Sequence, residues 1–251
     1  MAKSILITGA TSGFGAACAE IFSRNKWNVI LTGRRKDRLN NLKKKLGKFS
    51  SVYTSQLDVR NSDEVEKLIT NLPQEFRDID VLVNNAGLAL GLDSADEANL
   101  EDWDIMVDTN IKGLLYCTKS VLKTMVKKNS GHIVNIGSTA GNWPYPGGNV
   151  YGATKSFVQQ FSRNLRADLL GTKVKVTNIE PGMAETEFSL VRFKGDSKKA
   201  EKVYENADLL QPEDIADIIL WVVNTPERVN INTLEVMATC QAWGHLQVHR
   251  N

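Results

Sequence analysis

The first apolar run of the chain leads directly into the turn Thr8-Gly9-Ala10-Thr11-Ser12-Gly13-Phe14-Gly15. A helix-period segment follows, so the order is strand, glycine-rich turn and helix, as in a dinucleotide-binding unit. Gly9 permits the tight turn, Gly13 lets the backbone approach a pyrophosphate, and Gly15 allows the helix to pack closely on the strand. The free N–H groups and the dipole at the start of the helix favour phosphate there. The pattern also fits a plain sharp turn between a strand and a helix, so further motifs must decide.

Outside this turn, short β-rich apolar runs alternate with longer helix-period segments along the whole chain. This alternation predicts an α/β protein with a parallel sheet that is covered by helices on both faces. The expected strands are residues 4–8, 28–32, 51–56, 79–83, 131–136, 173–179 and 231–236. The expected helices are residues 13–25, 36–46, 62–72, 99–128, 151–170 and 212–224. No repeat or linker-like stretch divides the sequence, which predicts a single domain over residues 1–251.

The composition excludes several classes of protein. With 42% hydrophobic and 24% charged residues, the chain is close to the globular average, which argues against a disordered, collagen-like or coiled-coil protein. The 31 basic and 29 acidic residues leave a net charge of +2, too little for a broad cationic field. No apolar stretch approaches the roughly 18 residues of a membrane span. Neither nucleic acid nor a membrane is therefore expected as a partner.

The histidines and cysteines predict no metal site. His132, His245 and His249 lack metal-ligand spacing and are interpreted as surface or tail residues. The three cysteines are widely spaced and form no C-x-x-C pair, so neither a zinc site nor a disulfide framework is expected. The apolar run at the N-terminus is too short for the core of a signal peptide. These features predict a cytoplasmic protein.

The second expected strand ends at Thr32-Gly33-Arg34-Arg35. An NAD-selective site places a carboxylate here to bind the ribose 2′-hydroxyl, and this sequence has none. Guanidinium groups suit a 2′-phosphate instead, because their planar fork engages both its oxygens and its charge. The sequence thus predicts NADP(H), with Arg34 as the first contact and Arg35 as the second. A basic start to a surface helix is the alternative interpretation.

The segment 183–208 interrupts the alternation of strands and helices. It follows an expected strand and Pro181-Gly182, and it then becomes rich in charged residues. A solvated helix is one interpretation. Ligands bind beyond the carboxyl ends of the strands in open α/β sheets, and this position favours a substrate lid.

Tyr151 and Lys155 are four residues apart on an expected helix, so their side chains point from the same face. Hydride transfer to or from an alcohol carbon needs a general acid or base, and no histidine is suitably placed. A phenol titrates near roughly pH 10, and a neighbouring ammonium favours the phenolate, which predicts a lowered pKa for Tyr151. Ser138 follows the strand 131–136 and is expected to hold the substrate oxygen. Taken alone, Tyr-x-x-x-Lys also occurs in purely structural helices.

In combination, these motifs resemble the short-chain dehydrogenase/reductase family. The matching stretches, in chain order, are 8–15, Asp58-Val59, Asn84-Asn85-Ala86-Gly87, Asn110, Ser138, Tyr151 with Lys155, and Pro181-Gly182 followed by Thr186. The resemblance covers nearly the whole chain. It implies a Rossmann-type, doubly wound sheet of seven parallel strands and an NADP(H)-dependent enzyme that acts on a CH–OH group.

The resemblance also implies a catalytic tetrad. In this arrangement Tyr151 is the acid or base, and Lys155 lowers its pKa and binds the nicotinamide ribose. Ser138 orients the substrate oxygen, and Asn110 holds a water in a proton relay behind Lys155. Asp58 meets the adenine, and Thr186 meets the carboxamide together with the backbone near Gly182. The cofactor contacts implied in full are Gly9, Thr11, Ser12, Gly13, Phe14, Gly15, Arg34, Arg35, Asp58, Val59, Asn85, Ala86, Gly87, Tyr151, Lys155, Pro181, Gly182 and Thr186.

The stretches 135–145, 147–151 and 191–196 resemble one subgroup of this family. It contains NADP-dependent 3-hydroxy acid dehydrogenases, which act on serine, allo-threonine and 3-hydroxypropionate, and the related sulfoacetaldehyde reductases. Such substrates are small and carry an anion. Arg192 is therefore expected to bind that anion, and Tyr145 to close the pocket beside Ser138. A solvent-exposed Arg192 is the alternative interpretation.

Two questions stay open at the level of the sequence. The run Met183-Ala184-Glu185 is shorter than in the hydroxy acid enzymes, which leaves the choice between a carboxylate and a sulfonate substrate undecided. A non-catalytic NADP(H)-binding sensor is the competing class, because a fold does not establish a function. The intact tetrad argues against it. Family resemblance further implies that the helices 99–128 and 151–170 pair between subunits, and that the last strand and the tail to Asn251 complete a homotetramer.

Overall fold

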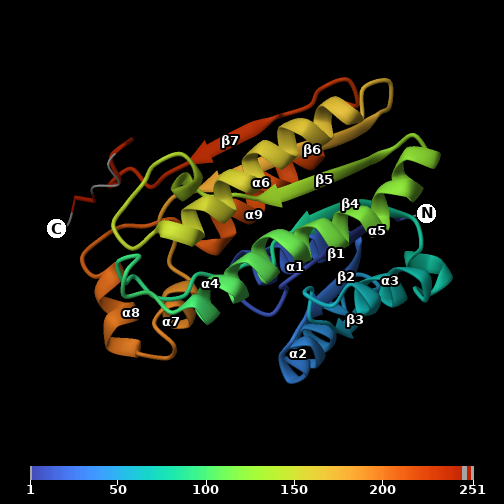
Figure 1. Cartoon of the computed structure of the whole chain (residues 1–251). Helices are drawn as coiled ribbons and strands as arrows, with labels where there is room; N and C mark the ends of the chain where they lie inside the picture. The colour runs from blue at the N-terminus through green and yellow to red at the C-terminus, as the bar shows by residue number, and fades with distance from the viewer. Residues whose placement is uncertain (1, 245–247, 250–251) are drawn as a thin grey trace.

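The computed structural model describes residues 2–244 and 248–249, and it contains a seven-stranded parallel sheet (Figure 1). The strands are β1 (Ser4–Ile7), β2 (Asn28–Gly33), β3 (Val52–Gln56), β4 (Ile79–Asn84), β5 (Gly131–Ile136), β6 (Val174–Pro181) and β7 (Thr233–Val236). Their order across the sheet is β3-β2-β1-β4-β5-β6-β7. Strand order therefore reverses between β1 and β4, which is where ligands bind in such sheets. The predicted doubly wound α/β fold is confirmed.

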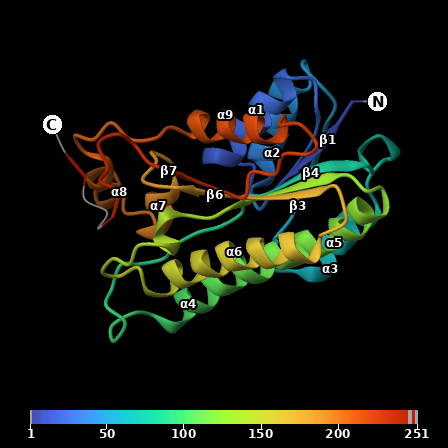
Figure 2. The same ribbon diagram turned by 90° about the horizontal axis from the view of Figure 1, so that it is seen from above.

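Helices cover both faces of the sheet. They are α1 (Gly13–Arg24), α2 (Lys36–Leu46), α3 (Ser62–Thr70), α4 (Leu100–Val107), α5 (Leu114–Lys127), α6 (Asn149–Asp168), α7 (Phe188–Arg192), α8 (Ser197–Tyr204) and α9 (Pro212–Val223). Figure 2 shows α1, α2 and α9 on one face and α3, α4, α5 and α6 on the other. Alternate residues of β1 belong to opposite apolar layers: Ile5 and Ile7 pack in one, and Leu6 packs in the other. This alternation follows from the period of two along a strand.

The single helix expected over residues 99–128 is interrupted. A π-helical turn, Asp108–Gly113, separates α4 from α5. A Cβ at Gly113 would lie 2.6 Å from Val59 Cγ2, so this turn packs closely against the chain that follows β3. Such turns insert an extra residue into a helix and often occur at functional sites. Here the turn carries Asn110.

The interpretation of His132 as a surface residue is wrong. Its side chain lies on β5 and is 3% exposed. Its Nε2 lies 2.8 Å from Thr177 Oγ1, and because that hydroxyl donates to the Ile231 carbonyl, Nε2 carries the proton. Burial lowers the pKa of His132 to about 3, so the ring is neutral. His249 is exposed, whereas His245 and the end of the tail at Asn251 lie outside the described residues.

The segment 183–208 holds two short helices, α7 and α8, instead of one. In Figure 1 both lie in orange beyond the carboxyl ends of the strands. The Asp196 side chain begins α8 by accepting a hydrogen bond from Lys199 N at 3.1 Å. Within the described ranges, no helix has both the length and the apolar character needed to cross a membrane.

Candidate active site

Three residues of the expected tetrad meet at the carboxyl end of β5. Tyr151 and Lys155 lie on α6, and both are buried. Lys155 Nζ lies 5.8 Å from the centre of the Tyr151 ring and donates a hydrogen bond to the Ile136 carbonyl at 2.8 Å. Ser138 Oγ accepts a hydrogen bond from Ala140 N at 3.1 Å, and Ser138 lies near enough to the Tyr151 phenol to act on its pKa. Tyr151 and Lys155 come together because they are four residues apart on α6, and Ser138 joins them because it follows the end of β5.

Asn110 lies beside this group, but its side chain is hydrogen-bonded to other residues of the protein. Its Oδ1 accepts from Leu88 N at 2.9 Å, and its Nδ2 donates to the Leu88 carbonyl at 2.8 Å and to Thr154 Oγ1 at 3.0 Å. A Cβ at Gly87 would lie 3.3 Å from Asn110 Oδ1 and 3.6 Å from Lys155 Nζ. The π turn thus holds Asn110 next to Lys155, while the water relay implied there stays a prediction.

The pKa predicted for Tyr151 is wrong in direction. Burial raises the pKa of Tyr151 to about 12, although the hydrogen bond with Ser138 and the charge of Arg192 act to lower it. Burial also lowers the pKa of Lys155 to about 8. A nearby ammonium favours the phenolate, but loss of water around the phenol is the larger effect. In this structure Tyr151 holds its proton at neutral pH.

Arg192 of α7 lies over the phenol of Tyr151. Its Nη2 donates to the Tyr145 hydroxyl at 2.9 Å, and its Cζ lies 5.2 Å from the Tyr151 ring centre and 5.0 Å from that of Phe188. Cation–π contacts of this kind hold a guanidinium over aromatic faces. Arg192 Nε is buried and has no hydrogen-bond partner in the described part of the chain. The alternative of a solvent-exposed Arg192 is therefore not what the structure shows.

The glycine-rich turn adopts the backbone that the sequence predicts. Gly9 has φ +64° and Gly13 has φ +50°, both in the left-handed region that favours glycine. A Cβ at Gly15 would lie 2.5 Å from the Gly9 carbonyl and from Asn85 Nδ2, so α1 begins in close contact with the loop after β4. No larger residue fits at Gly15 without moving backbone atoms.

The loops after β1 and β4 are hydrogen-bonded to each other. Thr8 Oγ1 accepts from Asn85 N and from Ala86 N, each at 3.0 Å, and Asn85 Nδ2 donates to the Thr8 carbonyl at 2.9 Å. These bonds cross the point where the strand order reverses. They hold these two loops together at the place where the resemblance puts the cofactor.

The start of α1 is open to an anion. Ser12 is the N-cap residue, but its side chain does not cap the helix; its Oγ instead accepts from Arg35 Nη2 at 2.7 Å. The first-turn N–H groups therefore have no side-chain partner from the N-cap. Phe14 packs on the apolar core beside them. Free N–H groups and a guanidinium together suit a phosphate.

Arg35, rather than Arg34, lies against the glycine-rich turn. Its Nε and Nη2 donate to Thr11 Oγ1 at 3.1 and 3.0 Å, and its Nη1 pairs with Glu187 at 2.7 Å. Arg38 pairs with the same carboxylate at 2.6 Å. Sequence reasoning missed Arg38 and Glu187. Arg38 stands only three residues after Arg35, in the first turn of α2, and this closeness in the sequence was a signal for Arg38.

Arg34 lies toward the end of β3. Hydrogen bonds from Arg60 hold the pKa of Asp58 below its usual value, and the charge of Arg34 lowers it further. Arg60 Nη2 and Asp58 Oδ2 are 2.6 Å apart. Val59 packs against the backbone of Gly113 in the π turn. Arg35 therefore contacts the glycine-rich turn, whereas the charge of Arg34 acts on Asp58.

The chain after β6 packs over the glycine-rich turn. A Cβ at Gly13 would lie 3.4 Å from Thr186 Cβ, which places the expected carboxamide contact directly above that turn. Met183 N donates to Gln241 Oε1 at 3.0 Å, and a Cβ at Gly182 would collide with the same oxygen. Gln241 was not predicted to lie near the site. It is far from Gly182 in the sequence, and no motif marks it.

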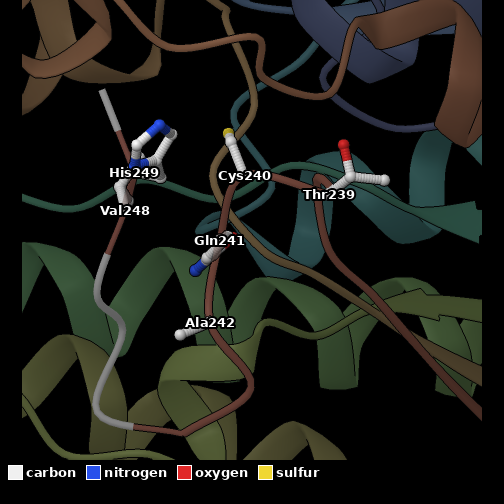
Figure 3. Close-up of a pocket in the computed structure, with 6 residues that line it drawn as sticks. All are labelled: Thr239, Cys240, Gln241, Ala242, Val248 and His249. Carbon is white, nitrogen blue, oxygen red and sulfur yellow. The ribbon is translucent and has the colours of Figure 1, made fainter. Parts of the chain in front are cut away.

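Gln241 also lines an open pocket of about 450 Å³ (Figure 3). Its lining residues are Thr239, Cys240, Gln241, Ala242, Val248 and His249. It contains none of the tetrad residues. Among the described residues, no three His, Cys, Asp or Glu side chains gather in a way that would hold a metal ion.

The site described above is that of a known family. A model of the short chain dehydrogenase family matches residues 3–196, and the chain belongs to this family. It is 59% identical to an NADP-dependent 3-hydroxy acid dehydrogenase, YdfG, from Salmonella typhi, over 98% of this chain and 99% of that protein. It is 51% identical to sulfoacetaldehyde reductase 2 from Chromohalobacter salexigens, over the full length of both.

Solved structures give the same result. The structure described as the closed form of serine dehydrogenase complexed with NADP⁺ superposes with a TM-score of 0.94 at 56% identity, covering 99% of this chain and 100% of that one. A crystal structure of serine dehydrogenase from Escherichia coli superposes with a TM-score of 0.84 at 50% identity, covering 96% and 100%.

Proposed function

We propose that this chain is an NADP(H)-dependent oxidoreductase that interconverts a small anionic alcohol and its aldehyde or ketone. The observation that carries this proposal is the guanidinium of Arg192, which lies over Tyr151, is bonded to Tyr145 and keeps a buried, unpartnered Nε. A buried donor without a partner is costly unless a ligand supplies the acceptor. A carboxylate or sulfonate does so, and it adds an opposite charge.

The residues around the cleft fit NADP(H). The positive-φ glycines Gly9 and Gly13 and the uncapped start of α1 suit the pyrophosphate, and Arg35 beside them suits the 2′-phosphate. Relatives named for NADP dependence, and the serine dehydrogenase structure that holds NADP⁺, support this cofactor. When bound, the cofactor supplies or accepts the hydride.

In the direction of reduction, Tyr151 acts as the acid. Because burial keeps its pKa near 12, Tyr151 enters the reaction as a neutral phenol and donates its proton to the substrate oxygen. Ser138 holds that oxygen by a hydrogen bond, and Lys155 lies below the phenol. Arg192 binds the anionic end of the substrate. In the oxidation direction Tyr151 must lose its proton first, and the positive charge of Arg192 favours that loss.

The substrate we favour is a 3-hydroxy acid such as serine, allo-threonine or 3-hydroxypropionate, the last formed from malonic semialdehyde. Sulfoacetaldehyde, reduced to isethionate, is the second candidate. It is supported by the 51% identity to a sulfoacetaldehyde reductase. The test compares kcat/KM for the NADPH-dependent reduction of malonic semialdehyde and sulfoacetaldehyde. Failure on both, with good activity on neutral ketones or sugars, would refute an anionic substrate.

We also propose a homotetramer. The stacked rings of Phe157 and Phe161, 5.9 Å apart on α6, lie only partly buried and leave an apolar face for a second subunit. Light scattering tests this, and a monomer would contradict it. The cytoplasmic location stays a prediction.

A further inference from the structure

Glu187 lies between two arginines that come from the opposite side of the cleft. Arg35 Nη1 is 2.7 Å from Glu187 Oε2, and Arg38 Nη1 is 2.6 Å from Oε1, so each carboxylate oxygen takes one guanidinium. Burial raises the pKa of Glu187, but the hydrogen bonds from the two arginines outweigh it and hold the pKa below its usual value. At neutral pH the group is a carboxylate.

The same guanidiniums face the place where a 2′-phosphate belongs. Arg35 also donates to Thr11 and Ser12 of the glycine-rich turn, so three of its four contacts lie on the wall of the cofactor cleft. A phosphate that takes Arg35 donors brings a second anion next to Glu187. Two like charges within hydrogen-bond distance of one guanidinium repel each other, and they compete for its N–H groups.

Glu187 is joined directly to the substrate end of the cleft. It precedes α7, whose last residue is Arg192. At the end of α7 the Arg192 carbonyl accepts from Gly91 N at 2.9 Å, and just beyond it Lys194 pairs with Asp102 at 2.7 Å. The start of this segment is therefore held by Arg35 and Arg38, and its end by residues that follow β4 in the chain. Glu187 is the residue directly before α7, so a change in its contacts acts on the start of the helix that carries Arg192.

We propose that Glu187 competes with the ribose 2′-phosphate for Arg35 and Arg38, and so lowers the preference for NADP(H) over NAD(H) while tying α7 to the cofactor site. This proposal rests on the proposed NADP(H) dependence. In this proposal Glu187 determines cofactor specificity in the opposite direction to the arginines: they favour NADP(H), and Glu187 reduces that preference. Because coupling is reciprocal, a bound 2′-phosphate loosens the Glu187 contacts to the same extent that Glu187 weakens phosphate binding.

The expected effect is modest. The Glu187 side chain is 38% exposed, and ion pairs near the surface are screened by water and salt. Two ion pairs on one carboxylate contribute more free energy than a single pair. We therefore expect Glu187 to weaken NADP⁺ binding by roughly three- to tenfold.

The test uses the full-length protein and Glu187→Gln, with Glu185→Gln as a matched control. Glu185 lies two residues earlier in the same segment and contacts Gln211 at 3.3 Å rather than an arginine. Dissociation constants for NADP⁺ and NAD⁺ are measured by titration, and adenosine 2′-monophosphate is compared with adenosine 5′-monophosphate. Glu187→Gln is expected to tighten NADP⁺ and the 2′-nucleotide three- to tenfold and to leave NAD⁺ and the 5′-nucleotide unchanged. Glu185→Gln is expected to change none of them.

Other outcomes separate the two proposals. Equal changes for NADP⁺ and NAD⁺ in Glu187→Gln indicate a purely structural role and overturn the inference, as does weaker NADP⁺ binding. Glu187→Ala is the second variant and is expected to shift binding in the same direction. If the unmodified protein shows no preference for NADP⁺, the proposed cofactor itself is wrong, which is a different failure from an unresponsive Glu187.

Discussion

At the Tyr151 end of the cleft the ionisable side chains are buried, whereas at the Arg35 end they are half exposed and paired with each other. Burial shifts the pKa of Tyr151 to about 12 and that of Lys155 to about 8. At the other end, Arg35 and Arg38 find their counter-charge in Glu187. Charges act strongly where water is excluded and weakly where it is not. The buried end is thus suited to chemistry, and the exposed end to selecting the cofactor.

Replacing Tyr151 with Phe tests the buried end most severely. General acid–base catalysis typically contributes a factor of 10² to 10⁴, so we expect kcat to fall about a thousandfold. NADPH binding, followed by fluorescence titration, is expected to stay nearly intact, which would also separate an enzyme from a sensor. Tyr145→Phe is the control and is expected to change KM more than kcat. Near-normal kcat in Tyr151→Phe would remove the phenol from the mechanism.

The pH dependence of stability tests whether Lys155 is desolvated. Burial lowers the pKa of Lys155 from its ordinary value of 10.5 to about 8, so burial of the charged form destabilises the fold below about pH 8. That penalty disappears as the pH rises from 8 to 10.5, because the unfolded state then holds the extra proton. The free energy of unfolding relative to Lys155→Met is expected to rise by up to about 3 kcal/mol over this range. A difference that stays flat in chemical denaturation would contradict the burial of this charge.

Arg192→Ala tests the anion-binding role at the same end. A hydrogen bond to a charged group contributes about 1.5–3 kcal/mol, so KM for an anionic aldehyde is expected to rise roughly 30-fold. KM for a neutral aldehyde of similar size is expected to change little. Lys194→Ala removes a neighbouring charge that pairs with Asp102, and it serves as the control. Equal effects on both aldehydes would show that Arg192 only shapes the pocket.

At the exposed end, Arg35→Gln is expected to raise KM for NADPH about tenfold and to leave KM for NADH nearly unchanged. Arg34→Gln is expected to have the smaller effect, because Arg34 lies toward Asp58 rather than the glycine-rich turn. Steady-state kinetics with NADPH and NADH test which of the two variants has the larger effect. A larger loss in Arg34→Gln would restore the ranking that the sequence alone predicts and would place the phosphate nearer to β3.

Much of the fold could be predicted, because its signals are local. Apolar runs and helical periodicity located all seven strands, and the expected helix 36–46 matches α2 at both ends. The π turn at Asp108–Gly113 was missed, since the helical period continues across it. At this turn Gly113 is in close contact with Val59, and these two residues are far apart in the sequence. The burial of His132 was missed for a similar reason: its partner Thr177 lies on another strand.

Local patterns in the sequence were enough to predict the glycines of the first turn and the side chains that meet beyond β5, namely Ser138 and, on one helical face, Tyr151 with Lys155. These placements need only the period of a strand or helix and the direction of a parallel sheet. Tertiary packing, in contrast, sets the pKa of Tyr151, the place of Arg192 over its ring, and the pairing of Glu187 with arginines about 150 residues earlier. Burial and the meeting of distant segments depend on how the whole chain packs, and no local pattern encodes either.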